Sequence, residues 1–130
     1  MSSVLIDTQA MIWIVEDNPN LSERGLALAD NRTTQRLFSV ASIWEMAIKI
    51  AIGKLDLKHG TLDEFLSIIK DNEVELLQVQ ALEAVDVALL SQGDHKDPFD
   101  RLIAAQCLRY DLTLVSIDSE FDQYGVRRVW

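Results

Sequence analysis

The sequence has little of what marks several broad classes of protein. Its single cysteine, Cys107, excludes an internal disulfide framework and any zinc site built from cysteines. Only 12 basic residues stand against 21 acidic ones, and the net charge of −9 argues against a broad basic surface for nucleic acid or for an anionic membrane. Apolar stretches such as 85–90 are interrupted by charge well before the roughly 18 residues of a membrane span, and the N-terminus lacks a basic region followed by a long apolar run. We therefore expect a cytoplasmic, reduced protein.

Glycine and proline are also scarce, with five and two residues, and no linker, repeat or low-complexity run divides the chain. The 130 residues are 48% hydrophobic and 25% charged, the balance of an ordinary folded domain. A single domain over residues 1–130 is therefore predicted.

Short apolar runs alternate with longer helical patterns. Asp97 and Pro98 open the clearest helix, as an N-cap residue followed by proline at the first helical position. The predicted strands are 3–6, 36–40, 74–77, 112–117 and 126–130, and the predicted helices are 8–15, 21–30, 43–52, 61–70, 82–90 and 98–108. The helix over 43–52 is apolar nearly all round, which predicts a buried helix. Such alternation predicts an α/β fold with a parallel sheet covered by helices on both faces.

Acidic residues stand at informative places in this pattern. Asp7 directly follows the first predicted strand, and Asp118 follows the strand over 112–117. Glu45 and Asp100 each lie about one turn into a predicted helix. In open α/β sheets, ligands bind beyond the carboxyl ends of the strands, so these four carboxylates are expected to converge there.

Four carboxylates in one pocket need a counter-charge, because neighbouring like charges disfavour joint ionisation. A hard divalent cation supplies it, and ligation by oxygen alone suits Mg²⁺ or Mn²⁺. An ion held in this way activates a water molecule and stabilises a phosphate under attack. The expected reaction is metal-assisted hydrolysis of a phosphodiester.

Each acid also has a structural interpretation. Ser42 and Glu45 fit a helix capping box, and Glu45 stands four residues before Lys49, the spacing of a helical ion pair. Asp97 fits a helix N-cap, Asp100 in the first turn of that helix is stabilised by the helix dipole, and Asp7 and Asp118 fit turn or cap positions. The nearly apolar surroundings of Glu45 weaken its structural interpretation, because glutamate is almost never fully buried unless it is paired or bound.

Four basic residues lie near these acids in the sequence and are candidates to meet a phosphate: Lys49, His95, Lys96 and Arg101. Most exposed lysines and arginines are simply solvated, and a histidine in a loop before a helix is more often a surface hydrogen-bonding residue than a general base. Cys107 lies in an apolar helical stripe and is interpreted as a packing residue.

Four segments in order resemble the PIN-domain ribonucleases, and more narrowly the VapC-type toxins of toxin–antitoxin pairs. They are Leu5-Ile6-Asp7-Thr8, the run from Ser39 to Glu45, the run from His95 to Gln106, and Leu114-Val115-Ser116-Ile117-Asp118. The resemblance extends from about residue 3 to Trp130 and includes the closing Tyr124-Gly125-Val126.

This resemblance implies a three-layer α/β/α sandwich around a small parallel sheet. It implies that Asp7, Glu45, Asp100 and Asp118 are catalytic residues that hold Mg²⁺ or Mn²⁺, with Asp97 and Asp122 as further possible ligands. Ser116 matches a hydroxyl position near that site, and Ser116, Lys49 and Arg101 are candidate substrate contacts. The implied substrate is RNA, the implied partner is a cognate antitoxin that covers the active-site groove, and the implied assembly is a homodimer.

Two alternatives stay open. A phosphoacceptor receiver domain has similar length and topology, but it normally needs two adjacent acids after the first strand and a late lysine. Here Asp7 stands alone, and no lysine follows Lys96. A non-catalytic PIN-like interaction module would be expected to have lost part of the acidic quartet, which is complete in this chain.

Overall fold

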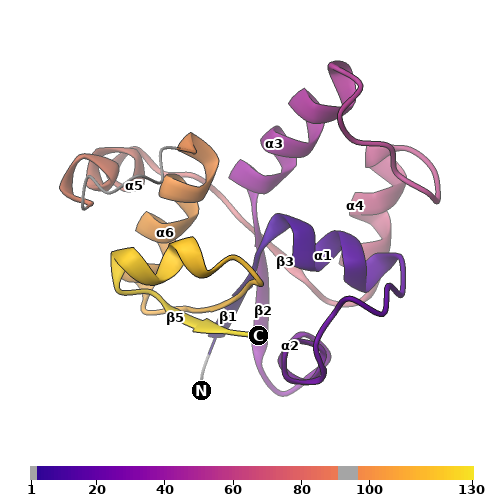
Figure 1. Cartoon of the computed structure of the whole chain (residues 1–130), viewed down its shortest axis with the longest axis horizontal. Helices are drawn as coiled ribbons and strands as arrows, with labels where there is room; N and C mark the ends of the chain where they lie inside the picture. Colours follow the sequence, from indigo (N-terminus) through magenta and orange to yellow (C-terminus); the bar gives the residue numbers. More distant parts are fainter. Residues whose placement is uncertain (1–2, 91–96) are drawn as a thin grey trace.

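The computed structural model describes residues 3–90 and 97–130, and in it five parallel strands form one sheet between two groups of helices (Figure 1). The strand order is β3-β2-β1-β4-β5, and every neighbouring pair is parallel. The strands are β1 (Ser3–Ile6), β2 (Gln35–Ser39), β3 (Glu75–Leu77), β4 (Thr113–Val115) and β5 (Arg127–Val129). The α/β sandwich expected from the sequence is confirmed.

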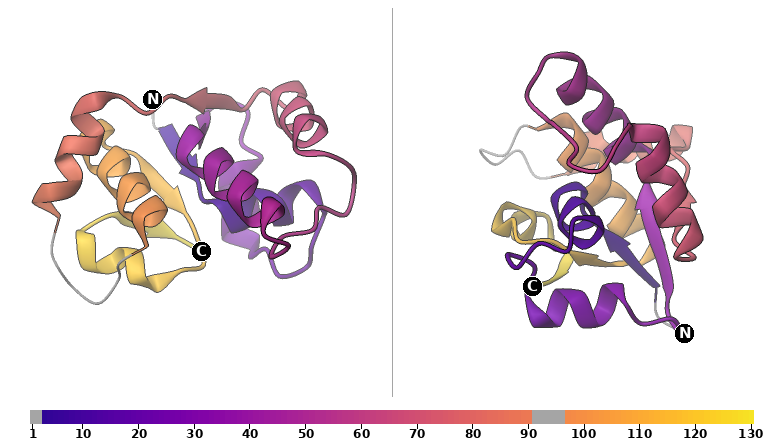
Figure 2. Two further views of the ribbon diagram at one scale, coloured as in Figure 1. Left: turned by 90° about the horizontal axis from the view of Figure 1, so that it is seen from above. Right: turned by 90° about the vertical axis from the view of Figure 1, so that its right-hand side faces the viewer.

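The helices separate onto two sides of the sheet, as views along two axes show (Figures 1 and 2). One side carries α1 (Thr8–Val15), α2 (Glu23–Ala29) and α4 (Leu62–Asp71), and the other carries α5 (Ala81–Asp86), η1 (Val87–Leu89), α6 (Pro98–Tyr110) and η2 (Ser119–Tyr124). The remaining helix, α3 (Val40–Ala51), directly follows β2 and stands over the end of the sheet. No helix in the described part of the chain has the length and apolar character needed to cross a bilayer.

Successive side chains along a strand point to opposite faces of the sheet, and they form one hydrophobic core on each face. In β1, Val4 and Ile6 pack on the side of α1 and α4, whereas Leu5 packs on the side of α6. All three side chains are buried. Burial of both faces requires an apolar strand without polar alternation, which is the pattern that predicted a parallel sheet.

Most predicted elements occur within a few residues of their predicted bounds. The prediction of Asp97 as the N-cap of α6 is confirmed, since its carboxylate accepts the N–H groups of Phe99 and Asp100. The helix continues two residues past the expected end, to Tyr110, and Asp111 closes it in the left-handed conformation with φ 54°.

The start of α3 differs from the sequence-based expectation. The helix begins at Val40, its N-cap is Ser39, and Ser42 lies inside it. The capping box proposed for Ser42 and Glu45 is therefore wrong. Ser39 caps the helix by accepting the Ala41 N–H at 3.1 Å. Its hydroxyl also donates at 2.6 Å to the buried amide oxygen of Gln106 on α6, a contact that only the tertiary fold creates.

The prediction of a buried helix at this place is also wrong for its second half. The side chains of Ile48, Ile50 and Ile52 are exposed, and Trp44 is exposed while its ring meets Phe99 edge-on at 5.1 Å. The helix leaves the sheet as it proceeds, so only its first turns are covered (Figure 1).

Candidate active site

A cavity of about 540 Å³ opens at the carboxyl ends of the strands. It lies where the chain order in the sheet reverses, because β1 pairs with β2 on one side and with β4 on the other. Among the described residues, five carboxylates and two ammonium groups line it: Asp7, Glu45, Asp97, Asp100, Asp118, Lys49 and Lys54. The convergence expected from the sequence is present, although the strands and helices that carry these residues are far apart in the chain.

Asp7 is the most constrained of these acids. It directly follows β1, caps α1 and is 7% exposed. Its Oδ1 accepts the Thr8 N–H at 2.8 Å, and its Oδ2 accepts the Ser116 hydroxyl at 2.8 Å. Burial raises the pKa of Asp7 to about 6, in spite of the lowering effect of both hydrogen bonds. The charges of Glu45 and Asp118 raise it further. A cation in this cavity would therefore favour the ionised form of Asp7.

Glu45 is 5% exposed and holds one partner on each carboxylate oxygen. Its Oε1 lies 2.7 Å from the Thr8 hydroxyl, and its Oε2 lies 2.6 Å from the Lys49 ammonium. The Thr8 and Ser42 hydroxyls are 2.8 Å apart. Since a hydroxyl has one proton and an ionised carboxylate only accepts, Thr8 donates to Glu45 and Ser42 donates to Thr8.

Thr8 is a site residue that the sequence argument left without a role. Its hydroxyl fixes Glu45 of α3 beside Asp7, so one residue connects the acids that follow two different strands. The sequence feature that could have identified Thr8 is its position directly after Asp7 at the start of a helix. This position turns the Thr8 side chain toward the same edge of the sheet. Lys54, beyond the end of α3, was missed because nothing in its surrounding sequence marks it.

Ser116 and Asp118 follow β4. The Ser116 side chain is fully buried, and its hydroxyl donates to Asp7 while its oxygen accepts the Asp118 N–H at 3.0 Å. Ser116 therefore positions Asp7 and has no free surface for a substrate. Asp118 caps η2 by accepting the Glu120 N–H at 2.9 Å, and it still lines the cavity.

Asp97 and Asp100 enter the cavity from the first turn of α6. One oxygen of Asp97 accepts two backbone N–H groups, at 2.9 and 3.1 Å, which gives it the structural role expected of a cap. The two acids together help to raise the pKa of the Lys49 ammonium, after the larger effect of its hydrogen bond to Glu45.

Asp122 and Arg101 do not line this cavity among the described residues. Both oxygens of Asp122 accept the Arg128 guanidinium, at 2.9 and 3.1 Å, and this pairing lowers the pKa of Asp122. Arg101 reaches the Val87 carbonyl at 3.3 Å and stands over the Tyr124 ring. His95 and Lys96, which the sequence placed near the acids, lie outside the described residues.

The donor set of the cavity suits a hard divalent cation, because every candidate ligand is a carboxylate oxygen. Within residues 3–90 and 97–130, however, no three His, Cys, Asp or Glu side chains are arranged to hold an ion as they stand. Lys49 engages one oxygen of Glu45, and N–H groups engage Asp97 and Asp118. The residues fit Mg²⁺ or Mn²⁺ in kind, and ligation requires side chains to turn.

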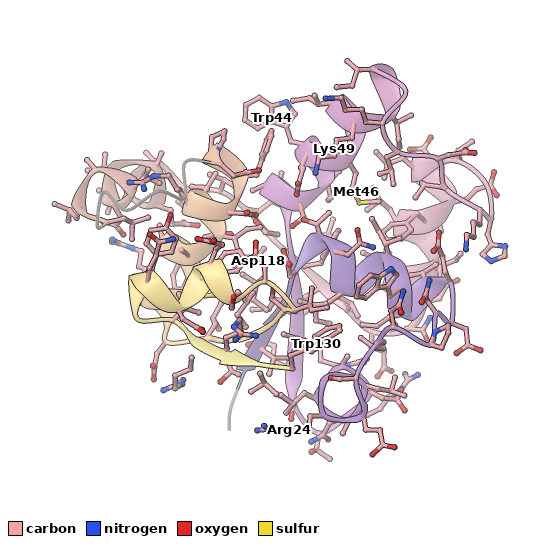
Figure 3. The ribbon with its side chains drawn as sticks, viewed as in Figure 1. Arg24, Trp44, Met46, Lys49, Asp118 and Trp130 are labelled. Atoms are coloured by element: carbon pink, nitrogen blue, oxygen red, sulfur yellow. The ribbon has the colours of Figure 1, made fainter. Side chains whose placement is uncertain are left out.

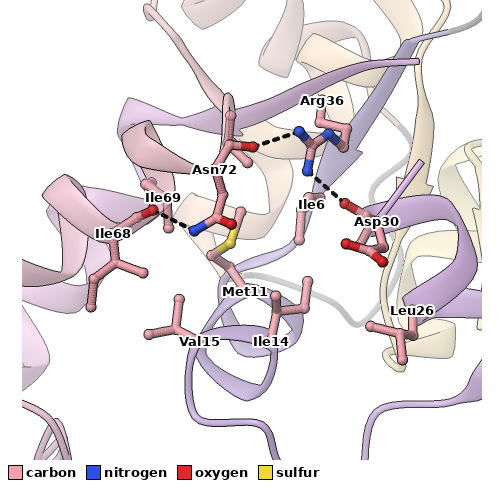
Figure 4. Close-up of a pocket in the computed structure, with 12 residues that line it drawn as sticks. Ile6, Met11, Ile14, Val15, Leu26, Asp30, Arg36, Ile68, Ile69 and Asn72 are labelled. Atoms are coloured by element: carbon pink, nitrogen blue, oxygen red, sulfur yellow. Dashed lines mark hydrogen bonds between the residues drawn. The ribbon is translucent and has the colours of Figure 1, made fainter. Parts of the chain in front are cut away.

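A second cavity, of about 300 Å³, has a different chemistry (Figure 4). It lies between α1, α2 and α4 and is lined largely by aliphatic side chains. Its buried cation is Arg36, which donates to the carbonyl oxygens of Ala29 and Asn72 at the ends of α2 and α4. These helix ends carry partial negative charge, so Arg36 joins two helices to the sheet. Asp30 is the only carboxylate among the described residues that line it.

Comparisons with known proteins bear on the family and on the fold. A family model of the PIN domain matches residues 4–126. A search of curated proteins finds no match.

Several solved structures share the fold at low sequence identity. A chain of the VapBC2 complex from Rickettsia felis, bound to a promoter DNA fragment, has a TM-score of 0.73 and 16% identity, with 97% of this chain and 96% of that chain covered. A chain of DNA-bound VapBC from Salmonella typhimurium has a TM-score of 0.69 and 17% identity, covering 99% and 98%. A chain of FitAcB from Neisseria gonorrhoeae has a TM-score of 0.67 and 18% identity, covering 98% and 96%. At these identities, the likeness shows the fold.

Proposed function

Because the chain belongs to the PIN domain family, we propose that it is a metal-dependent endoribonuclease that hydrolyses RNA phosphodiester bonds and acts as the toxin of a toxin–antitoxin pair. The observation that carries this proposal is the set of five carboxylates lining one cavity at the switch point of the sheet. The complexes among the structural neighbours, which include VapBC, support the assignment to a toxin. The cytoplasm, where RNA is abundant, is the proposed compartment.

The proposed metal ligands are Asp7, Glu45, Asp100 and Asp118, with Asp97 as a further candidate from the edge of the cavity. When bound there, Mg²⁺ or Mn²⁺ supplies an activated water molecule and stabilises negative charge on the phosphate. Ser116 and Thr8 hold the carboxylates of Asp7 and Glu45 in place through hydrogen bonds of 2.8 and 2.7 Å. Such outer contacts fix the orientation of a ligand and strengthen it as a base.

Lys49 and Lys54 are the proposed phosphate contacts inside the cavity. Both line it, and both carry flexible stems that allow the ammonium to follow an RNA backbone. Arg101 remains a more distant candidate from α6. Local cations of this kind compensate for the net charge of −9, which repels RNA at long range.

The test is cleavage of total cellular RNA by the purified chain with Mg²⁺, with Mn²⁺ and with EDTA, beside Asp7→Asn as a matched control for contaminating nuclease. We expect discrete fragments that require the metal and are missing from the variant, whose fold is verified by circular dichroism. A folded Asp7→Asn protein that cleaves as the wild type does would refute the metal role of this acid.

The alternative function is a non-catalytic PIN-like interaction module. It draws on one observation, namely that no three acidic side chains of the described residues are arranged to hold an ion. Calorimetric titration with Mn²⁺ separates the two functions, because the nuclease must bind the ion and the module need not.

We propose an antitoxin and a second copy of the chain as protein partners. An acidic cavity attracts basic side chains, so the antitoxin is expected to place lysine or arginine there. For the second copy, the support is an exposed apolar row on one face of α5 and η1, formed by Leu82, Val85 and Leu89. A neutral antitoxin surface in a complex would contradict the first proposal, and a monomer in sedimentation equilibrium at high concentration would contradict the second.

A further inference from the structure

Lys49 occupies an unusual position for a surface lysine. Its side chain is 46% exposed, yet its ammonium lies 2.6 Å from Oε2 of Glu45, whose own side chain is 7% exposed. Figure 3 shows the residue on α3, above Asp118 at the centre of the molecule. The charges of Asp97 and Asp100 reach the same ammonium across the cavity from α6. One cation of the chain therefore lies among the acids that would otherwise face one another.

The two oxygens of Glu45 are held in different ways. Oε1 accepts from Thr8, which is 7% exposed and fixed at the start of α1. Oε2 accepts from Lys49, at the end of a stem that is half in solvent. The first contact is built into the packing, whereas the second can be exchanged by rotation of a flexible side chain.

A divalent ion and an ammonium on the same carboxylate oxygen would lie a few ångströms apart, and two cations at that distance repel strongly in a partly desolvated cavity. With Lys49 in place, no three acidic side chains of residues 3–90 and 97–130 are arranged to hold an ion. The acids are instead neutralised in part by the protein itself.

We propose that Lys49 is a built-in counter-cation, which pairs with Glu45 in the metal-free protein and has to leave Oε2 before Glu45 ligates a divalent ion. This inference rests on the proposed metal-dependent function. It assigns two consequences to one side chain: the metal-free acid cluster is kept compact, and metal affinity is set lower than the carboxylates alone would give. After displacement, the ammonium remains within the cavity, on the side of α3.

The decisive measurement is calorimetric titration of Mn²⁺ into metal-free wild type, Lys49→Met and Lys54→Met. Lys54 lines the same cavity and is exposed, so Lys54→Met removes an equal charge without touching the Glu45 pair. We expect Lys49→Met to bind Mn²⁺ about tenfold more tightly, the size of one exchanged ion pair, and Lys54→Met to change affinity less than about twofold. Lys49→Gln serves as a second variant if Lys49→Met unfolds.

A spectroscopic measurement follows the displacement directly. In ¹⁵N spectra of lysine side chains at low temperature, the ammonium of Lys49 should give a slowly exchanging signal in the metal-free protein, because its protons are hydrogen-bonded. Addition of the diamagnetic ion Mg²⁺ should remove that signal. Lys49→Met identifies it by its absence.

Each outcome decides between the inferences. An equal increase in Mn²⁺ affinity in the two methionine variants would mean that only long-range charge matters. Weaker Mn²⁺ binding by Lys49→Met would mean that the lysine supports the ion. Either result overturns the counter-cation role of Lys49 and leaves the proposed metal site standing. Absence of Mn²⁺ binding in the wild type and in every variant would overturn the metal-dependent function together with this inference.

Discussion

Glu45 and Glu83 are both buried glutamates, yet their hydrogen-bond partners and surroundings differ. Glu83 is fully buried on α5, where it accepts the Gln106 amide at 2.7 Å, the Tyr110 hydroxyl at 2.7 Å and the Gln80 N–H at 3.0 Å. Glu45 is also nearly buried but faces a cavity, and one of its two partners is a half-exposed ammonium. A carboxylate sealed among fixed neutral donors holds the fold together, whereas one paired with a movable cation is available to a ligand.

The hydrogen bonds around Glu83 form a network that extends toward the site without entering it. Gln106 joins Glu83 to Ser39, which caps α3, so the network connects α5 and α6 to the start of the helix that carries Glu45. Buried networks of this kind help to specify one arrangement of a core when every member is satisfied. Here that arrangement positions the first turns of α3.

The largest expected effect is that of a Glu45 substitution on RNA cleavage. Glu45→Gln keeps the shape of the side chain and removes its charge, so we expect RNA cleavage to fall by more than about 100-fold, beyond the loss typical of an outer contact of a metal site. The free energy of unfolding should change little, because the amide still accepts from Thr8. Cleavage assays and urea denaturation measure the two quantities. Cleavage close to wild type would remove Glu45 from the proposed ligands.

The matched substitution of the other buried glutamate is Glu83→Ala, and we expect it to affect stability. It leaves the Gln106 amide and the Tyr110 hydroxyl without their buried acceptor, which we expect to lower the free energy of unfolding by roughly 2–5 kcal/mol. Metal-dependent cleavage per folded molecule should stay within about threefold at low temperature, since Glu83 does not line the cavity. Urea unfolding gives the first quantity. An activity loss as large as that of Glu45→Gln would erase the distinction between the two glutamates.

Asp7, a third buried acid, makes stability depend on pH. Burial raises its pKa from 3.8 to about 6, so the folded protein binds this proton more tightly than the unfolded chain does. Its contribution therefore makes stability fall as pH rises from about 4 to about 6, and ionised Asp7 costs roughly 3 kcal/mol at higher pH.

In EDTA, Asp7→Asn should accordingly be more stable than the wild type at pH 8, by up to about 3 kcal/mol. The difference should shrink toward zero near pH 4. Thermal or urea unfolding at several pH values measures it. A stability difference that is the same at both pH values would show that it does not arise from the ionisation of Asp7.

Asp122→Asn is expected to have the smallest effect. Its carboxylate is exposed and paired with Arg128 away from the cavity, and a surface pair of this kind contributes about 0–1 kcal/mol. Cleavage and Mn²⁺ affinity should stay within about twofold of the wild type. A loss of Mn²⁺ affinity comparable to that of Glu45→Gln would return Asp122 to the ligand set.

Local patterns in the sequence predicted much of this molecule. The strand over 3–6 and the helix that opens at Asp97 and Pro98 were predictable because their signals are short-range: apolar runs, an N-cap and a proline at the first turn. The Glu45 and Lys49 pair was predictable from helical spacing alone. The acids at strand ends were expected to converge because parallel strands end at the same edge of a sheet.

The sequence by itself determined the fold class, the order of the elements and the residue types at the strand ends, since each depends on neighbours within a few positions. Only the tertiary structure decided that Ser39 is the N-cap of α3, because Gln106 reaches that cap from 67 positions away. It also decided that Thr8 holds Glu45, and that Asp122 turns from the cavity to Arg128. These contacts join residues whose proximity follows from packing, and no local pattern encodes them.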